Sequence, residues 1–168
     1  MTDRFVIMGV AGSGKSHIGV ALADRIGAEY LDGDDLHPPA NIEKMSRGDP
    51  LTDEDRWPWL DLVGDALANS TSDTIIGCSA LKRTYRDRIR AKSPNAVFLY
   101  LHGDRELIET RMAARDGHFM PVSLLDSQFS TLEVPGADER HVKVDIVGTP
   151  EMVVDALVTA LARFDAIP

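Results

Sequence analysis

Short runs of apolar residues alternate along the chain with longer stretches in which apolar side chains recur at helical spacing. The apolar runs indicate strands, and their nearly unbroken hydrophobic character is typical of strands buried on both faces of a parallel sheet. The predicted strands cover residues 4–8, a short stretch ending near 32, and residues 74–77, 96–101 and 142–147. The predicted helices cover about 15–26, 53–68, 81–91, 105–115 and 150–164. This alternation predicts an α/β fold with helices on both sides of the sheet.

The length and charge of the chain narrow the classes of protein that it can belong to. Its 168 residues fit one domain with a sizeable core, and its net charge of -9 argues against a nucleic-acid partner. The apolar runs are too short to cross a bilayer, and the N-terminus lacks the basic start and apolar stretch of a signal peptide. The single cysteine, Cys78, fits a reducing compartment and is expected to be a small buried residue. We therefore expect a cytoplasmic protein without a membrane partner.

Residues 9–16 read GVAGSGKS and satisfy the phosphate-binding pattern GxxxxGK[ST] between a predicted strand and a predicted helix. The glycines let backbone amides turn toward phosphate oxygens, and the following helix adds the positive end of its dipole. Lys15 is predicted to be catalytic by bridging the β- and γ-phosphates, and Ser16 to bind the Mg²⁺ that accompanies ATP. The alternative is a flexible glycine turn. The predicted nucleotide contacts in this region are Gly12, Ser13, Gly14, Lys15, Ser16 and His17.

Three acidic residues follow the second predicted strand in the sequence Asp32-Gly33-Asp34-Asp35. Open α/β sheets place their ligands at this end of their strands. Alternation along an extended strand would direct the side chains of Asp32 and Asp34 the same way. We predict that Asp32 holds the hydrated magnesium ion and that Asp34 accepts the proton of the attacking hydroxyl. The alternative is a solvated acidic turn.

A phosphate-binding loop alone does not separate a kinase from a GTPase, a motor ATPase or a nucleotide sensor. The third predicted strand ends in Gly77-Cys78-Ser79, without the aspartate that many P-loop ATPases carry there to orient the metal. Asp32 is the best-placed substitute for that acid. This pattern resembles small-molecule and nucleoside monophosphate kinases.

Arg111 and Arg115 are four residues apart on one predicted helical face, and residues 116–121 after them contain a glycine and could form a flap. Closure of such a flap would bring both guanidinium groups onto the phosphates, where cations stabilise the transferring phosphoryl group. We predict that both arginines contact the nucleotide and that Arg115 is catalytic. The alternative is a surface pair bound to Glu106 or Glu109.

Adenine recognition is difficult to predict because it often depends on backbone groups and an apolar slot. Arg111 could stack on the base instead of touching a phosphate. Residues 136–140, which lead into the last predicted strand, are a second candidate for the wall of the slot.

Five blocks of sequence, in order and at family-like spacing, resemble the gluconate kinases, the gluconokinase branch of the shikimate-kinase-like P-loop kinases. The resemblance covers most of the chain up to about Pro135. The blocks are residues 9–16; 32–38 with Asn41, Lys44 and Met45; 48–51 with 53–60; 78–83 with 85–87; and 118–121 with 124–125, 127–129, 131–133 and Pro135.

This resemblance implies a P-loop NTPase fold whose five-stranded parallel sheet has the strand order 2-3-1-4-5. It implies a single kinase domain over residues 1–168, with a substrate-binding helical segment at about 37–70 and a mobile lid at about 116–135. ATP and Mg²⁺ are the implied cofactors. A homodimer is implied by the resemblance only.

The implied activity is transfer of a phosphoryl group from ATP to the 6-hydroxyl of D-gluconate. A substrate with one carboxylate and several hydroxyls calls for a fork-shaped cation and hydrogen-bonding side chains. By analogy with shikimate-type kinases, Arg56 is expected to bind the carboxylate, with Asp34 beside the reacting hydroxyl. The implied substrate contacts are Asp34, His37, Lys44, Arg56, Ser79, Lys82 and Gln128.

Two other functions stay open at this point. One is a kinase of the same architecture that acts on shikimate, another sugar acid or a nucleoside monophosphate. The other is a P-loop regulator that binds nucleotide without transferring a phosphoryl group. The family-like substrate blocks count against the regulator.

Overall fold

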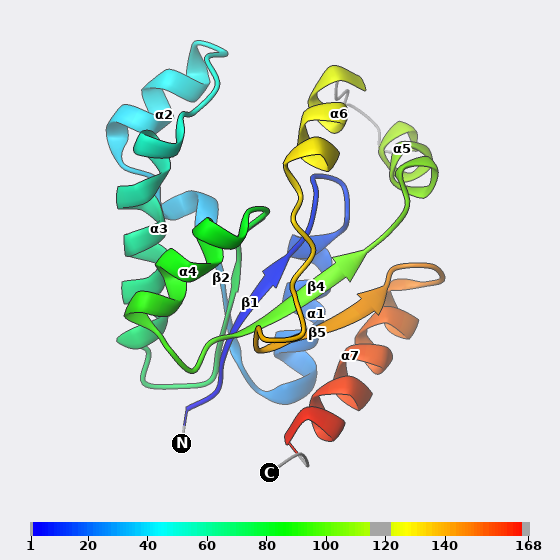
Figure 1. The fold of residues 1–168 in the computed structure, drawn as a ribbon. Helices are drawn as coiled ribbons and strands as arrows, with labels where there is room; N and C mark the ends of the chain where they lie inside the picture. The colour runs from blue at the N-terminus through cyan, green and yellow to red at the C-terminus, as the bar shows by residue number, and fades with distance from the viewer. Residues whose placement is uncertain (1, 115–121, 166–168) are drawn as a thin grey trace.

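The computed structural model describes residues 2–114 and 122–165, which form a five-stranded parallel sheet covered by helices (Figure 1). The strand order is β2-β3-β1-β4-β5, as the family resemblance implied. The strands are β1 (Arg4–Met8), β2 (Glu29–Asp32), β3 (Thr74–Gly77), β4 (Val97–His102) and β5 (His141–Asp145). The helices are α1 (Lys15–Ile26), α2 (Pro39–Ser46), α3 (Asp53–Ala68), α4 (Arg83–Lys92), α5 (Arg105–Ala113), α6 (Val122–Thr131) and α7 (Pro150–Asp165), with the 3-10 helix η1 (Gly33–Leu36).

All five predicted strands and all five predicted helices are confirmed, with ends displaced by at most about two residues. The elements α2, α6 and η1 were not predicted individually, although α2 falls in the helical segment at about 37–70 and α6 in the lid at about 116–135 that the resemblance implied. Arg115 and residues 116–121 of the predicted flap and lid lie outside the described ranges. Within those ranges, no helix has the length and apolar character needed to cross a bilayer.

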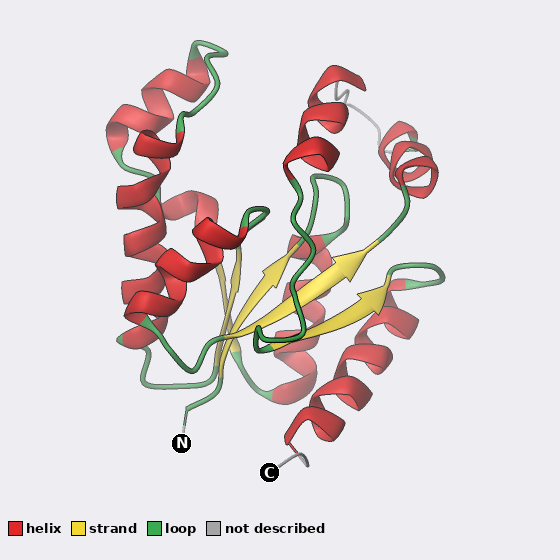
Figure 2. Ribbon diagram, in the orientation of Figure 1, coloured by secondary structure: helices red, strands yellow, loops and turns green. Residues whose placement is uncertain are grey.

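The sheet separates two layers of helices (Figure 2). Side chains of α1 and α7 share one hydrophobic core with β1, β4 and β5, whereas α3 and α4 share the other with β1, β3 and β4. The central strands β1, β3 and β4 are almost wholly buried, as predicted. The prediction that the strands are buried on both faces was wrong for the two edge strands, β2 and β5, because alternate residues of each are exposed.

The parallel register brings the carboxyl ends of the central strands to one edge of the sheet. Asp32 at the end of β2 is paired with Gly77 at the end of β3, and Gly77 with Ile7 of β1. The phosphate-binding loop after β1, the acidic turn after β2 and the loop after β3 therefore lie next to one another. This edge is where open α/β sheets bind their ligands.

Candidate functional site

The loop between β1 and α1 has the backbone conformation that phosphate binding requires. Gly12 and Gly14 have φ angles of 81° and 91°, which favour glycine. A Cβ atom on Gly12 would also come within 2.7 Å of Met112, so α5 packs closely against the loop. The Lys15 amino group donates to the carbonyls of Gly9 and Val10 at 3.0 and 3.1 Å. Burial lowers the pKa of this amine, and the nearby acidic side chains of Asp32 and Asp34 oppose that shift.

A cavity of about 200 Å³ lies beside this loop, and its lining residues come from four separate parts of the sequence. We call it the catalytic cavity because the predicted catalytic residues Lys15 and Asp34 line it. The predicted site residues among its walls are Lys15, Ser16, Asp32, Asp34, Ser79 and Gln128. An amine, a hydroxyl and two carboxylates thus face one space that is large enough for phosphate groups and the end of an acceptor. The tertiary structure brings together the groups that phosphoryl transfer needs.

Asp32 and Asp34 share the cavity for a different reason from the predicted one. The expectation of a continuing extended strand was wrong, because β2 ends at Asp32 and Asp34 lies in η1. Asp32 caps that helix by accepting a hydrogen bond of 2.9 Å from the Asp34 amide. The Asp34 side chain lines the open cavity and is 79% exposed. Partial desolvation and the neighbouring Asp32 charge raise the pKa of Asp34 above its ordinary value.

Ser16 and Asp32 fit the predicted magnesium site. The Ser16 side chain is exposed to the same cavity that Asp32 lines. The described ranges hold no cluster of three or more His, Cys, Asp or Glu side chains that would enclose a metal. This arrangement suits Mg²⁺, which keeps several waters and binds substrate phosphates together with one or two protein oxygens.

His37 supports the acidic turn from behind rather than lining the cavity. Its buried ring stacks on Trp59 with centroids 4.1 Å apart, and its Nε2 lies 3.8 Å from Asp34 Oδ1. Burial lowers the pKa of His37, although Asp34 opposes that shift. The Trp59 indole donates a 2.8 Å hydrogen bond to the Gly33 carbonyl, so α3 holds the turn that carries Asp34.

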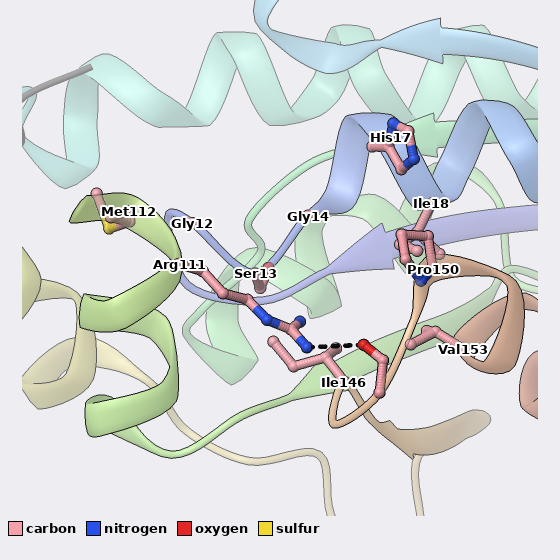
Figure 3. Close-up of a pocket in the computed structure, with 11 residues that line it drawn as sticks. Gly12, Ser13, Gly14, His17, Ile18, Arg111, Met112, Ile146, Pro150 and Val153 are labelled. Carbon is pink, nitrogen blue, oxygen red and sulfur yellow. Dashed lines mark hydrogen bonds between the residues drawn. The ribbon is translucent and has the colours of Figure 1, made fainter. Parts of the chain in front are cut away.

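A second cavity, of about 220 Å³, lies on the other side of the phosphate-binding loop. It is lined by the predicted nucleotide contacts Gly12, Ser13, Gly14, His17 and Arg111. Arg111 does not pair with Glu106 or Glu109 but donates a 3.0 Å hydrogen bond to the Gly148 carbonyl, which the dashed line in Figure 3 marks. This slot has the position and the lining expected for the base of a nucleotide whose phosphates lie in the loop.

The wall of this slot comes from a segment that the sequence analysis missed. Ile146 and Gly148 lie in the connection after β5, and Pro150 and Val153 lie at the start of α7. Figure 3 labels Ile146, Pro150 and Val153 on this wall. Residues 136–140, the predicted wall, do not line the slot. Instead Asp138 and Glu139 pair with arginines of α4. The β5–α7 connection lies near the phosphate-binding loop because the strand order places β5 next to β4, and β4 next to β1, which leads into that loop.

The other predicted substrate contacts lie away from the catalytic cavity. Lys44 of α2 forms a 2.6 Å ion pair with Asp55 of α3. Arg56 and Lys82 both approach Asp53, at 3.7 and 3.3 Å. The predicted catalytic residue Arg115 lies outside the described ranges.

Four further residues of the catalytic cavity were missed by sequence reasoning: Ala11, Tyr30, Gly77 and Cys78. Tyr30 precedes Asp32 by two residues on β2, so strand alternation was a signal that could have found it. Its buried hydroxyl has no hydrogen-bond partner in the described ranges. Burial raises the pKa of Cys78 to about 12, so this thiol stays protonated at neutral pH.

The chain is similar to several proteins of known name. A family model described as an AAA domain matches residues 5–135. The chain is 53% identical over 148 residues to the thermosensitive gluconokinase of Escherichia coli strain K12, covering 86% of this chain and 79% of that protein. It is 45% identical over 162 residues to the gluconokinase of Gluconobacter oxydans strain 621H, covering 94% and 91%.

Solved structures agree with these relatives. The crystal structure of a gluconokinase from Sinorhizobium meliloti 1021 matches with a TM-score of 0.89 at 48% identity, over 96% of this chain and 92% of that one. A shikimate kinase from Aquifex aeolicus matches with a TM-score of 0.67 at 14% identity, over 98% and 99%. The second likeness concerns the fold alone.

Proposed function

This chain belongs to the gluconokinase family, and we propose that it transfers the γ-phosphoryl group of ATP to the 6-hydroxyl of D-gluconate, yielding ADP and 6-phosphogluconate. The observation that carries the proposal is one cavity lined by Lys15 and Ser16 of the phosphate-binding loop and by Asp32 and Asp34 across from them. A donor phosphate and an acceptor hydroxyl can meet there in line.

In the proposed reaction the gluconate O6 forms a bond to the γ-phosphorus while the bond from that phosphorus to the β,γ-bridging oxygen breaks. The hydroxyl proton passes to the Asp34 carboxylate, whose raised pKa makes it a better acceptor than an ordinary aspartate. Lys15 leaves the carbonyls of Gly9 and Val10 and donates to phosphate oxygens. Ser16 and Asp32 would hold Mg²⁺, which would supply neutralisation of phosphate charge.

The neighbourhood of Asp34 suits a proton acceptor. Its own backbone amide is held by Asp32, and the Gly33 carbonyl before it is held by Trp59, so the turn that carries Asp34 is fixed from two sides. The lowered pKa of His37 keeps that imidazole neutral near pH 7, so His37 adds no positive charge beside Asp34. Fixed positioning of a reacting group contributes to catalysis by removing the cost of ordering it.

The test is a coupled assay of ADP release with a panel of acceptors. We expect D-gluconate to be the fastest acceptor, and ³¹P and ¹³C spectra of the product to place the phosphate on C6. Lys15→Ala serves as the inactive control. If shikimate or a nucleoside monophosphate exceeds gluconate tenfold, the substrate assignment is wrong. ADP release that no acceptor changes would support the non-catalytic regulator instead.

From the family resemblance alone, we also propose that the protein is a homodimer, and from its short apolar runs and single cysteine we propose that it is cytoplasmic. Light scattering of the purified protein measures the mass of the particle directly. A mass of one chain at micromolar concentration would contradict the dimer.

A further inference from the structure

Two cations that do not line the catalytic cavity converge on one aromatic ring. The guanidinium of Arg56, on α3, and the amine of Lys82, at the start of α4, each lie 5.5 Å from the centroid of the Tyr85 ring. That distance is within the range of cation–π attraction. Tyr85 is itself 5% exposed, and Trp57 contacts its ring edge-on at 5.8 Å. The ring is therefore a fixed surface against which both cations rest.

Asp53 contacts the same two cations. It accepts a 2.5 Å hydrogen bond from the Tyr85 hydroxyl, and its oxygens lie 3.3 Å from Lys82 Nζ and 3.7 Å from Arg56 Nη1. The Tyr85 hydrogen bond, together with Lys82, lowers the pKa of Asp53, so this carboxyl is ionised at neutral pH. We call Asp53, Arg56, Lys82 and Tyr85 the two-cation cluster.

The two-cation cluster has a net positive charge and N–H donors that could bind an anion. It has two positive charges and one negative charge, in a chain whose net charge is -9. The contacts from Asp53 to the cations are longer than its bond to Tyr85, and the Arg56 and Lys82 side chains remain 30% and 36% exposed. A guanidinium has five N–H donors, and Arg56 uses one of them on the Leu51 carbonyl at 2.8 Å.

The cluster is connected to the turn that carries Asp34 through α3. Arg56 precedes Trp59 by three residues on α3, a rise of about 4.5 Å, and Trp59 binds the carbonyl of Gly33 next to Asp34. The Arg56 charge contributes to the lowered pKa of His37, whose Nε2 is 3.8 Å from Asp34. From the other side, Lys82 follows the cavity residue Ser79 by three residues.

We propose that Tyr85 and Asp53 are positioning residues that hold Arg56 and Lys82 together as a two-pronged receptor for the acceptor's carboxylate. The inference rests on the proposed function, since it assigns the far end of the acceptor whose hydroxyl meets Asp34. It adds Lys82 to Arg56 as a carboxylate ligand, and it gives the Tyr85 hydroxyl a role through Asp53. The positive charges of Arg56 and Lys82 repel each other, so these two side chains would move apart in water. Asp53 attracts both and so keeps them close before the acceptor binds.

The test is Tyr85→Phe, which keeps the ring under the cations and removes only the hydroxyl that anchors Asp53. We expect the KM for gluconate to rise about three- to tenfold, because the cations lose their fixed placement and must be ordered when the acceptor binds. The kcat and the KM for ATP should stay within twofold of wild type. D-Glucitol, which has a hydroxymethyl group in place of the carboxylate, is the second probe. Its inhibition constant against gluconate should not change.

The matched control is Asp61→Asn. Asp61 also lies on α3 and accepts hydrogen bonds of 2.7 and 2.9 Å from Arg88 of α4, so it joins the same two helices without touching the two-cation cluster. We expect it to leave both constants unchanged. In a Lys82→Met background, Tyr85→Phe should raise the KM by a smaller factor than in wild type, because part of what it positions is already gone.

Three outcomes would overturn the inference. The first is a gluconate KM within twofold of wild type in Tyr85→Phe. The second is an equal weakening of gluconate and glucitol, which is the result of a merely structural role. The third is a Tyr85→Phe effect of undiminished size in the Lys82→Met background. Failure of the proposed function is distinguishable from all three, because the wild-type protein would then not phosphorylate gluconate at all.

Discussion

The backbone amide of Ala11 donates a hydrogen bond of 3.1 Å to the side-chain oxygen of Gln128, 117 residues further along the chain. Ala11 belongs to the phosphate-binding loop and Gln128 to α6, so this bond joins α6 to the loop directly. Backbone amides of such loops are the donors that bind phosphate oxygens. We therefore expect a bound nucleotide to compete with Gln128 for this N–H group.

Removal of this competitor should strengthen nucleotide binding. We expect Gln128→Ala to lower the Kd for a non-hydrolysable ATP analogue about two- to fivefold, within the range of one neutral hydrogen bond. Calorimetry on the wild type and the variant measures the change. Ser127→Ala, next to it on α6 and exposed, is the control. Weaker binding by Gln128→Ala would instead mean that Gln128 helps to hold the nucleotide.

Asp34→Asn should nearly abolish phosphoryl transfer and leave nucleotide binding intact. Loss of a general base costs about 10²- to 10⁴-fold in rate, whereas the nucleotide binds to the loop on the other side of the cavity. Single-turnover rates and the Kd for the ATP analogue separate the two effects. Asp35→Asn, on the same turn but outside the cavity lining, is the control. More than a tenth of wild-type turnover in Asp34→Asn would exclude Asp34 as an essential base.

The raised pKa of Asp34 also predicts the pH dependence of the reaction. The base acts only when it is deprotonated, so kcat/KM for gluconate should fall as pH drops through the pKa of Asp34 in the free enzyme. Burial and Asp32 raise that pKa, so the acid limb should lie above the ordinary aspartate value of 3.8. A profile of kcat/KM against pH checks this, and a limb at or below 3.8 would contradict the assignment.

Arg111→Ala should weaken ATP binding without affecting the acceptor. Arg111 lines the slot beside the phosphate-binding loop, and its guanidinium fixes the Gly148 carbonyl on the opposite wall. We expect the KM for ATP to rise about tenfold, as for loss of a charged hydrogen-bonding group. The KM for gluconate should stay constant. Arg25→Ala removes an exposed arginine of α1 that pairs with Asp155, and it should change neither constant.

Glu139→Gln should destabilise the fold. Glu139 accepts hydrogen bonds of 2.7 and 3.1 Å from Arg86, whose side chain is fully buried. Breaking such a pair costs about 3–5 kcal/mol, and each 1 kcal/mol lowers Tm by about 2–4 °C in a domain of this size. We therefore expect Tm to fall by about 10 °C. Asp138→Asn, which breaks the exposed neighbouring pair with Arg83, should lower Tm much less, because solvent screens that pair.

Acid should erase the difference between Glu139→Gln and wild type. Burial alone would raise the pKa of Glu139, but Arg86 and the Gly136 amide outweigh it and lower that pKa to about 2. A group whose pKa is depressed by folding stabilises the fold above its ordinary value of 4.5, and this contribution is lost as pH falls toward 2. Melting curves of both proteins between pH 7 and pH 2 measure the effect. A gap in Tm that stays constant would exclude the ion pair as its source.

Arg86 also connects stability to the catalytic cavity. Its guanidinium donates to the carbonyls of Ala80 and Leu81, at 2.8 and 3.1 Å. Ala80 has a φ of 45°, a strained conformation for a residue with a side chain. The buried pair thus holds the loop that carries Ser79 into the cavity. Residues 136–140, which include Glu139, were a candidate for the wall of the adenine slot. Glu139 instead binds Arg86, which holds this loop.

The sequence alone determined what is encoded in contiguous residues. The phosphate-binding loop, the acidic residues after β2 and every strand could be predicted, because a motif and a hydrophobic period are both local. The resemblance extended this to the strand order and to the family. Lys15, Ser16, Asp32, Asp34, Ser79 and Gln128 were all singled out in the sequence as site residues, and the structure places them around one cavity.

Only the tertiary structure decided which distant side chains meet. The slot wall at Gly148, the contact from Gln128 to Ala11 and the anchoring of Asp53 by Tyr85 join residues that are 32 to 117 positions apart. No local period encodes such pairs, because they depend on how strand order and helix packing bring separate segments together. For the same reason Asp34 reached the cavity through a 3-10 turn that Asp32 and Trp59 hold, and not through the extended strand that alternation predicted.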